Sequence, residues 1–251
     1  MIASPPRFIT RSANHHYTFD GVTYPGVTGV IGILDKSGPL MHWASRLTAE
    51  AAVALSGTLP QLIAETGAEG AIRALMERRT TKNDEAKLLG TEIHAIADLI
   101  VTGQSVPAMS PEVMTRVDSY ERWLRGSGWT LRASEGMVVS PGAGYGGTFD
   151  LLARDADGLT VLADIKTGKV DYQGKLYDSI LLQLAAYGAA EWLDIGDGQL
   201  YAMPAIDRYS VIHVTADGTT EKPAQVGDAE REAFGHALRL SRWRDSLKGN
   251  R

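Results

Sequence analysis

The segment Thr160–Lys166, with the sequence TVLADIK, constrains the fold of this chain more than any other part of the sequence. Apolar residues lie on both sides of Asp164, at Val161–Ala163 and at Ile165, which predicts a strand buried within a sheet. Because side chains alternate along a strand, Asp164 and Lys166 share one sheet face and Ile165 points to the other. An unpaired buried charge is costly, so Asp164 is expected to meet a cation.

A second carboxylate is expected beside Asp164. The preceding segment YGGTFDLLARD also has strand character, and the turn residues Asp155–Gly158 join it to the strand that holds Asp164. This hairpin brings Asp150 close to Asp164, and a divalent cation is the usual remedy for two buried carboxylates that repel. The repulsion predicts that Asp150→Asn stabilises the metal-free protein. A solvated sheet face with a surface salt bridge is the alternative interpretation, which the apolar neighbours of Asp164 weaken.

The first half of the chain is predicted to be largely helical. Strand-forming residues around Asp20–Gly21 predict a small hairpin, and apolar stripes predict four helices after it. These helices are expected at about residues 40–55, 60–78, 83–101 and 111–125, with Asn83 as the N-cap of the third.

The second half of the chain is predicted to contain most of the strands. A meander of TLRASEGMVV, YGGTFDLLARD and LTVLADIK is followed by a helix at KLYDSILLQLAAYGAAEWL, strands at QLYAMPAI and YSVIHVTA, and a last helix at about residues 228–247. The fold class is therefore α/β or α+β. A single domain over residues 1–251 is the simplest organisation, with a hairpin and helical extension at residues 1–82 and the core with its C-terminal helix at residues 83–251.

The composition excludes several kinds of site. The chain has 251 residues, of which 44% are hydrophobic and 22% charged, as in an ordinary globular protein. It has no cysteine, so thiolate zinc sites and cysteine-ligated iron–sulfur clusters are excluded, and any metal must be held by His, Asp or Glu. No apolar run reaches the length of a membrane span, which predicts a cytoplasmic protein with no membrane partner.

The glycines of Gly142–Gly147 match the pattern GxGxxG, which is typical of dinucleotide-binding proteins. That pattern must open a helix, whereas TFDLLARD follows here and has strand character. A hairpin connection is therefore the favoured interpretation of these glycines.

Three polar residues lie on predicted helices. His94 lies in GTEIHAIAD on the third helix, whereas Gln183 and Tyr187 are four residues apart and share one face of a later helix. Taken alone, His94 is most simply a surface or satisfied core residue, and the other two form the polar edge of an amphipathic helix.

Four short motifs occur in a fixed order, namely GTxxH, GTFD, DIKTGK and QLAAY. In this order and at these spacings, the sequence resembles the RecB-type branch of the PD-(D/E)XK nuclease superfamily. The nearer resemblance is to phage and prophage exonucleases related to the CRISPR adaptation nucleases, and it spans about Tyr24–Trp192. It implies a restriction-endonuclease-like core, in which helices flank a central mixed sheet.

The resemblance also implies the roles of the motif residues. Mg²⁺ or Mn²⁺ would be ligated by His94, Asp150, Asp164 and the backbone carbonyl of Ile165. Lys166 would orient or help deprotonate the attacking water, and Gln183 and Tyr187 would hold Lys166 and the DNA phosphate. Glu135 would have a supporting role, and Asp98 would either support His94 or be a plain solvent-facing acid.

Two departures from the family affect this interpretation. The CRISPR-associated members hold an iron–sulfur cluster on four cysteines, which this chain lacks, so it resembles the cluster-free phage forms. The net charge of -5 offers no global attraction to DNA, so local basic patches must provide it. The candidate DNA-binding residues are Arg78, Arg79, Lys82, Lys169 and Lys175, with further arginines on the last helix.

The sequence therefore predicts a metal-dependent DNA exonuclease of a bacterium or phage-infected host, acting on linear DNA in recombination or end processing. A second copy of the chain and a recombination protein are the candidate protein partners. A structure-selective endonuclease of the same fold, a non-catalytic DNA-binding partner and a structural metal protein are the alternatives.

Overall fold

The structure is a computed structural model that describes residues 8–34, 37–101, 103–107 and 109–248, without the side chains of residues 37–40, 79–87, 101 and 248. The chain divides into two compact units. The sheet unit combines Met1–Leu34 with Glu92–Arg251, and the helical unit is Asp35–Thr91. The division expected between residues 82 and 83 falls within one helix and stays a prediction.

A mixed sheet of seven strands forms the centre of the sheet unit, in the order β10-β9-β4-β5-β6-β11-β12. The strands are β4 (Thr130–Ser140), β5 (Tyr145–Arg154), β6 (Thr160–Lys166), β9 (Trp192–Asp194), β10 (Leu200–Ala202), β11 (Arg208–Val214) and β12 (Thr219–Ala224). The pair β6–β11 is parallel, and the other neighbours in this sheet are antiparallel. The expected meander of β4, β5 and β6 and the expected mixed sheet are thus confirmed.

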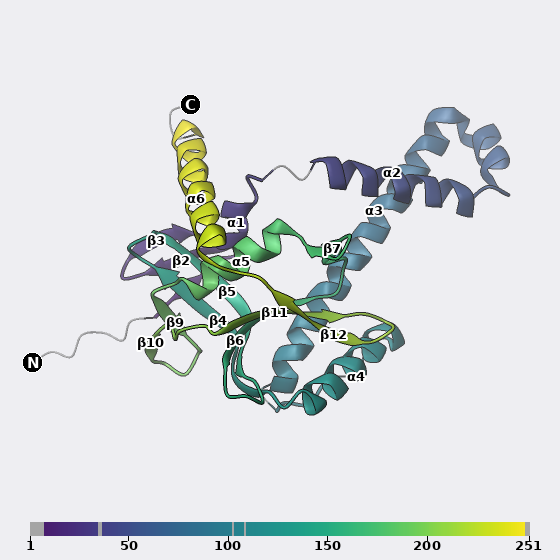
Figure 1. The fold of residues 1–251 in the computed structure, drawn as a ribbon. Helices are drawn as coiled ribbons and strands as arrows, with labels where there is room; N and C mark the ends of the chain where they lie inside the picture. The colour runs from purple at the N-terminus through teal and green to yellow at the C-terminus, as the bar shows by residue number, and fades with distance from the viewer. Residues whose placement is uncertain (1–7, 35–36, 102, 108, 249–251) are drawn as a thin grey trace, which may run out of the picture. The chain divides into compact units, whose positions relative to one another are not determined.

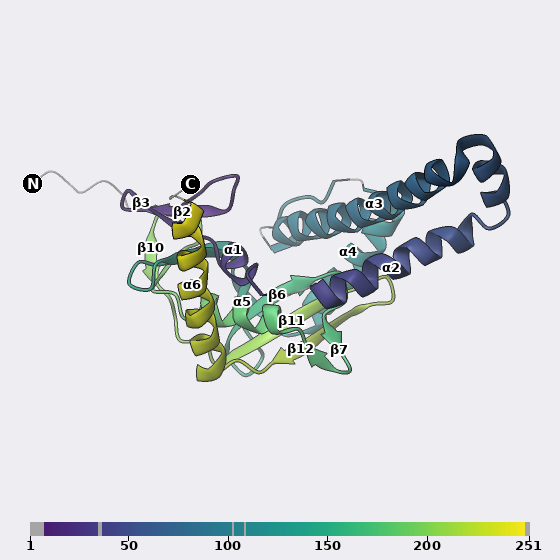
Figure 2. The same ribbon diagram turned by 90° about the horizontal axis from the view of Figure 1, so that it is seen from above.

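Helices flank this sheet (Figures 1 and 2), as the α+β prediction required. They are α1 (Val27–Ile31), α4 (Pro111–Gly126), α5 (Asp178–Gly188) and α6 (Asp228–Lys248). Helix α5 packs against β5 and β6, α1 and α6 pack against α5, and α4 packs against β11 and β12. Side chains such as Phe149, Leu162 and Leu184 are fully buried between α5 and the sheet.

The expected N-terminal hairpin is confirmed, and it packs against β5 of the central sheet. Strand β1 (Thr10–Arg11) pairs with β2 (His16–Phe19), which pairs with β3 (Val22–Pro25). Asp20 and Gly21 have φ of 49° and 76°, the left-handed pair that a tight type I′ turn needs. The Tyr17 hydroxyl lies 2.9 Å from Thr148 Oγ1 on β5, so the hairpin is fixed to the strand that carries Asp150.

The glycines at the start of β5 allow aromatic rings to approach the strand closely. A Cβ on Gly146 would lie 2.5 Å from Tyr17 Cβ, and a Cβ on Gly147 would lie 2.4 Å from Tyr187 Cε1. Gly144 has a φ of 81° in the turn before the strand. A strand follows these residues rather than a helix, which confirms the interpretation as a hairpin connection.

The helical unit contains α2 (Ser37–Ala54) and most of α3 (Leu59–Val101). The separate helices expected at about residues 60–78 and 83–101 were wrong, since α3 continues between them and Asn83 lies in its interior rather than at a cap. No glycine or proline occurs in residues 71–89, so nothing there forces a break. The kink falls instead at Gly67, with φ 72° and ψ 171°.

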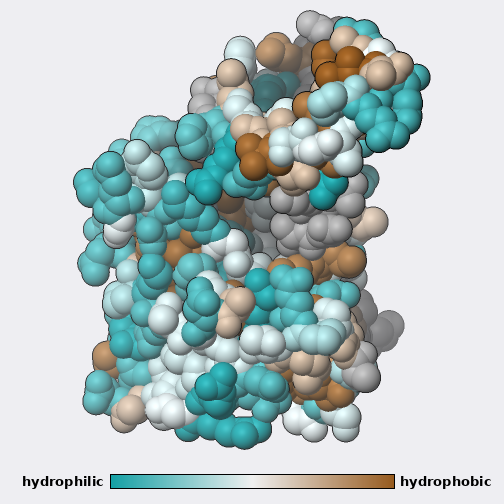
Figure 3. All heavy atoms as spheres, turned by 90° about the vertical axis from the view of Figure 1, so that its right-hand side faces the viewer, coloured by the Kyte–Doolittle hydropathy of each residue, from teal (hydrophilic) through white to brown (hydrophobic). Residues whose placement is uncertain are grey.

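Apolar side chains are exposed on the helical unit, where Figure 3 shows them in brown. They include Met41, Val53, Ile63 and Ile72. Among the described residues, no helix combines the length and the apolar character needed to cross a membrane.

The helix expected at KLYDSILLQLAAYGAAEWL is shorter than predicted at both ends. Lys175–Leu176 form β8 in a hairpin with β7 (Asp171–Tyr172), and Trp192–Asp194 form β9. Strand β9 pairs with Met137–Val139 of β4, a contact distant in sequence that helix periodicity does not reveal. The strands β7, β8, β9 and β12 and the helix α1 were not predicted from the sequence. These elements are short, so few residues show their hydrophobic periodicity.

The packing of Gly136 gives a stability prediction. A Cβ at this position would lie 2.4 Å from Cζ of the fully buried Phe149. Gly136→Ala is therefore expected to lower the free energy of unfolding by about 1–3 kcal/mol in urea titrations. Gly126→Ala at the end of α4 is the matched control, since a Cβ there meets nothing within 4 Å. Equal stability of both variants would contradict this account of β4 and β5.

Candidate metal centre

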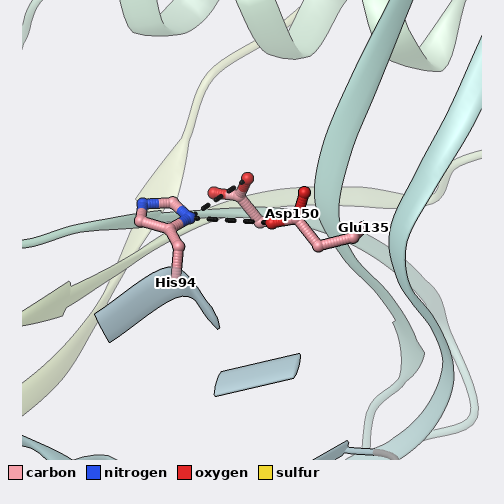
Figure 4. A group of neighbouring side chains, drawn as sticks. All are labelled: His94, Glu135 and Asp150. Atoms are coloured by element: carbon pink, nitrogen blue, oxygen red, sulfur yellow. Dashed lines mark ion pairs between the residues drawn. The ribbon is translucent and has the colours of Figure 1, made fainter. Parts of the chain in front are cut away.

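Three side chains of types that can ligate a metal converge within the sheet unit: His94 from α3, Glu135 from β4 and Asp150 from β5. Their ligand atoms all lie within 4.8 Å of one another. His94 Nδ1 is 3.5 Å from Asp150 Oδ1 and 3.9 Å from Glu135 Oε1. Figure 4 shows the imidazole and the two carboxylates pointing toward one another. One nitrogen and two carboxylates at this spacing form a donor set that suits a divalent cation.

The backbone of β4 has an unusual conformation at Glu135. Glu135 lies between Ser134 and Gly136 on β4, and their strand partners Leu151 and Phe149 flank Asp150 on β5. Glu135 has a φ of 49°, in the left-handed region that few residues other than glycine adopt. Such a conformation costs about 1–3 kcal/mol and is retained only where the surrounding structure enforces it.

Asp164 is the most deeply buried carboxylate at this site. It is 1% exposed, and Lys166 Nζ lies 2.5 Å from its Oδ2. This ion pair engages Oδ2, whereas Oδ1 has no hydrogen-bond partner in the described part of the chain. Burial raises the pKa of Asp164 to about 6, although Lys166 opposes the shift. A buried carboxylate with one oxygen left unpartnered fits a metal ligand.

Asp150 has partners on both of its oxygens. Its Oδ2 accepts a hydrogen bond of 2.6 Å from the Ile165 backbone N–H, and its Oδ1 faces His94. Burial opposes ionisation, but the interactions with His94 and Lys166 outweigh it and hold the pKa of Asp150 below its ordinary value. The prediction that Asp150 lies beside the DIK strand is confirmed by this hydrogen bond. The Ile165 carbonyl lies 3.5 Å from Lys166 Nζ, and its ligand role stays a prediction.

The two cations of the site are held in their charged forms. Burial lowers the pKa of His94, but the neighbouring carboxylates of Asp150 and Glu135 outweigh it and raise that pKa to about 10. Burial likewise disfavours charge on Lys166, yet Asp164 and Asp150 raise its pKa above the ordinary value. Without metal, the imidazolium and the ammonium therefore offset only part of the negative charge of the three carboxylates.

Gln183 and Tyr187 form a pair on α5, as their spacing predicted. Gln183 Nε2 donates a hydrogen bond of 2.9 Å to the Tyr187 hydroxyl. Tyr187 is buried against Gly147, and burial raises its pKa, so the ring is a neutral phenol. Their predicted contacts with Lys166 and with a phosphate stay predictions.

The candidate DNA-binding residues are divided between the units. Arg78 is exposed in the helical unit, whereas Lys169 and Lys175 are exposed in the sheet unit. The side chains of Arg79 and Lys82 lie outside the described residues. Asp98 is half-buried one helical turn after His94, and its supporting role stays a prediction.

One arginine of the last helix has a structural contact. Arg242 donates hydrogen bonds to the carbonyls of Ala143 and Gly144, the second at 2.9 Å. It therefore ties α6 to the turn before β5.

The sequence underestimated Glu135, which the structure groups with His94 and Asp150, while Asp164 contacts Lys166. The available signal was the Glu135–Gly136 dipeptide within a strand, because glycine inside a strand often marks a local irregularity. The left-handed φ of Glu135 lies at that point.

Comparisons with known proteins add little to this description. No protein-family model matches the chain, and no curated protein matches it. Among solved structures, one titled "Crystal structure of SSO0001" is similar, with 18% identity over 65% of this chain and 69% of that chain, and a TM-score of 0.28. A superposition at that TM-score establishes no shared fold. The chain's own geometry defines an α+β protein with a candidate metal centre.

Metal binding is expected to release a proton. The pKa of His94, at about 10, means that Mn²⁺ must displace its proton at neutral pH, so affinity should rise with pH. Titration calorimetry at pH 7, in two buffers that differ in ionisation enthalpy, should report the release of about one proton per Mn²⁺.

In the same titration, His94→Gln should bind Mn²⁺ more weakly and release almost no proton. His236→Gln is the matched control, since His236 is exposed on α6. Proton release that is absent in the wild type, or unchanged in His94→Gln, would contradict the assignment of His94 as a ligand.

The two aspartates should respond in opposite ways to neutralisation in the metal-free protein. Asp164→Asn is expected to raise the free energy of unfolding at pH 7 by about 1–2 kcal/mol, because burial disfavours the charge of Asp164. Asp150→Asn is expected to lower the free energy of unfolding by about 1–3 kcal/mol, because the Asp150 carboxylate accepts a hydrogen bond from the Ile165 N–H and faces His94. The second effect is the reverse of the expectation from the sequence.

The gain in Asp164→Asn should depend on pH. A folded-state pKa of about 6, above the ordinary 3.8, means that the penalty is full above pH 6 and disappears as the pH falls toward 4. Urea unfolding in EDTA across this range measures it. A gain that is constant from pH 4 to 7 would contradict the burial penalty at Asp164.

Proposed function

We propose that this protein is a metal-dependent deoxyribonuclease that hydrolyses phosphodiester bonds, acting as an exonuclease on linear DNA. The observation that carries the proposal is the buried carboxylate Asp164, which pairs with the Lys166 ammonium at 2.5 Å and has one oxygen without a hydrogen-bond partner among the described residues, beside the His94–Glu135–Asp150 group. Perturbed carboxylates beside a cation are typical of catalytic sites. The resemblance of the four motifs to PD-(D/E)XK nucleases supports the same chemistry.

The residues fit Mg²⁺ or Mn²⁺ as the cofactor. Asp150, Glu135 and Asp164 offer oxygen ligands, which both ions prefer, and the single imidazole of His94 makes Mn²⁺ a strong competitor. A bound ion of this kind supplies Lewis acidity at a phosphoryl oxygen and lowers the pKa of a coordinated water.

The side chains of the protein would orient the attacking water and the phosphate. Water forms a new bond to phosphorus as the bond from phosphorus to the 3′ oxygen breaks, and the leaving oxygen takes up a proton as the attacking water loses one. The raised pKa of Lys166 makes it an ammonium, which suits it to orient water and stabilise negative charge rather than to accept a proton. The Gln183–Tyr187 pair offers neutral polar atoms beside β5 for a phosphate.

Lys166→Ala should reduce DNA cleavage by at least about 100-fold while leaving the fold and Mn²⁺ binding largely intact. The matched control is Arg125→Ala, which removes an exposed cation that pairs with Glu121 on α4. End-labelled linear duplex, linear single strand and closed circular DNA are digested with Mg²⁺, Mn²⁺ or EDTA. Wild-type turnover in Lys166→Ala would rule out this mechanism.

The circular substrate decides between the alternatives. Loss of linear DNA with intact circles supports the exonuclease, whereas cut circles support a structure-selective endonuclease. DNA binding without metal-dependent cleavage would replace both with a non-catalytic DNA-binding or recombination partner.

A further inference from the structure

The segment that follows Lys166 folds into a short hairpin with an exposed aromatic ring. Strands β7 and β8 pair antiparallel, and Gln173 and Gly174 between them have φ of 52° and 79°. Two left-handed residues in sequence form a tight type I′ turn, which fixes the strands that flank it. Tyr172, directly before the turn, is 61% exposed. A large aromatic side chain is thus exposed to solvent and is not part of the hydrophobic core.

The charges around this ring are positive. Lys169 Nζ lies 5.3 Å from the centroid of the Tyr172 ring, and the exposed Lys175 is the strand partner of Tyr172. The acidic residue of the hairpin, Asp171, is engaged by Lys222 Nζ at 2.6 Å. That hydrogen bond lowers the pKa of Asp171 and offsets its charge. The hairpin therefore presents one ring between two lysines.

The base of the hairpin is fixed to the sheet unit. Val170 is 1% exposed in the core, and its carbonyl accepts a hydrogen bond of 3.0 Å from the Tyr177 N–H. The ion pair from Asp171 to Lys222 ties β7 to β12. Six residues of extended chain span at most about 20 Å, so Tyr172 lies within that distance of Lys166.

We propose that the β7–β8 hairpin binds the single-stranded end of the DNA substrate. Tyr172 stacks on an unpaired base, and Lys169 and Lys175 contact the neighbouring phosphates. Stacking on an exposed ring tolerates any base, and adjacent lysines attract the backbone. A local positive surface is needed because the chain carries a net charge of -5. This inference rests on the proposed function. It adds that the DNA end bound near the metal centre is single-stranded.

Binding of fluorescein-labelled single-stranded oligonucleotide, measured by anisotropy in EDTA, tests the site without cleavage. Tyr172→Ala should weaken binding by about 5- to 150-fold, the range found for loss of one stacked base. Tyr172→Phe should bind as the wild type does, because it keeps the ring. The matched control is Tyr201→Ala, which removes an exposed ring from β10 at the other edge of the sheet.

A spectroscopic readout separates stacking from a structural effect. The fluorescence of 2-aminopurine, placed in turn at each position near one end of the oligonucleotide, should be quenched by the wild type at one position. Tyr172→Ala should abolish the quenching at that position, and Tyr172→Phe should keep it. In Mg²⁺, Tyr172→Ala should raise KM for single-stranded ends with little change in kcat.

The outcomes distinguish this inference from the function on which it rests. Equal affinity, quenching and KM in the wild type and Tyr172→Ala would overturn the hairpin site, while Lys166-dependent cleavage would still stand. Tyr172-dependent binding with no metal-dependent cleavage would support the hairpin site and overturn the nuclease. A wild type that binds no single strand would overturn the hairpin site directly.

Discussion

The structure depends on one buried charge, the carboxylate of Asp164 in β6, an interior strand of the seven-stranded sheet. Only 1% of this residue is exposed, and its neighbours Ala163 and Ile165 are buried with it. The ammonium of Lys166 lies 2.5 Å from Oδ2, and Oδ1 has no hydrogen-bond partner among the described residues. One lysine offsets the cost of this burial incompletely, which is why the pKa of Asp164 is raised. A bound divalent cation would offset the remaining free-energy cost of burying this charge, so metal binding should stabilise the fold.

The surrounding elements bring other donors to this strand. The pairing of β5 with β6 places Asp150 beside Ile165. Glu135, with its left-handed backbone, adds a further carboxylate near His94 and Asp150. Helix α3 contributes His94 from the other side of the group (Figure 4). Glycines in β5 let Tyr17 and Tyr187 pack directly on the strand, which fixes its position. Local strain and close packing thus hold the charged groups together.

The sequence was a good guide where a physical rule acts over a few residues. Alternation along TVLADIK placed Asp164 and Lys166 together, and the Asp20–Gly21 turn predicted its hairpin. It failed where distant contacts decide: strand β9 forms because Trp192–Asp194 pairs with β4, against a helical pattern. Glu135 was expected only in a supporting role, and its left-handed backbone and its grouping with His94 and Asp150 were not anticipated. The continuity of α3 through Asn83 shows that polar residues alone do not end a helix.

The most direct test of the metal centre is anomalous diffraction from crystals soaked in MnCl₂. The account predicts a manganese peak in contact with Asp164, Asp150 and His94, with Lys166 Nζ moved from the 2.5 Å contact with Asp164. A second data set from Asp164→Asn crystals should lose the peak. No peak at these residues in well-ordered wild-type crystals, with the Asp164–Lys166 pair unchanged, would contradict the metal centre and the nuclease chemistry built on it.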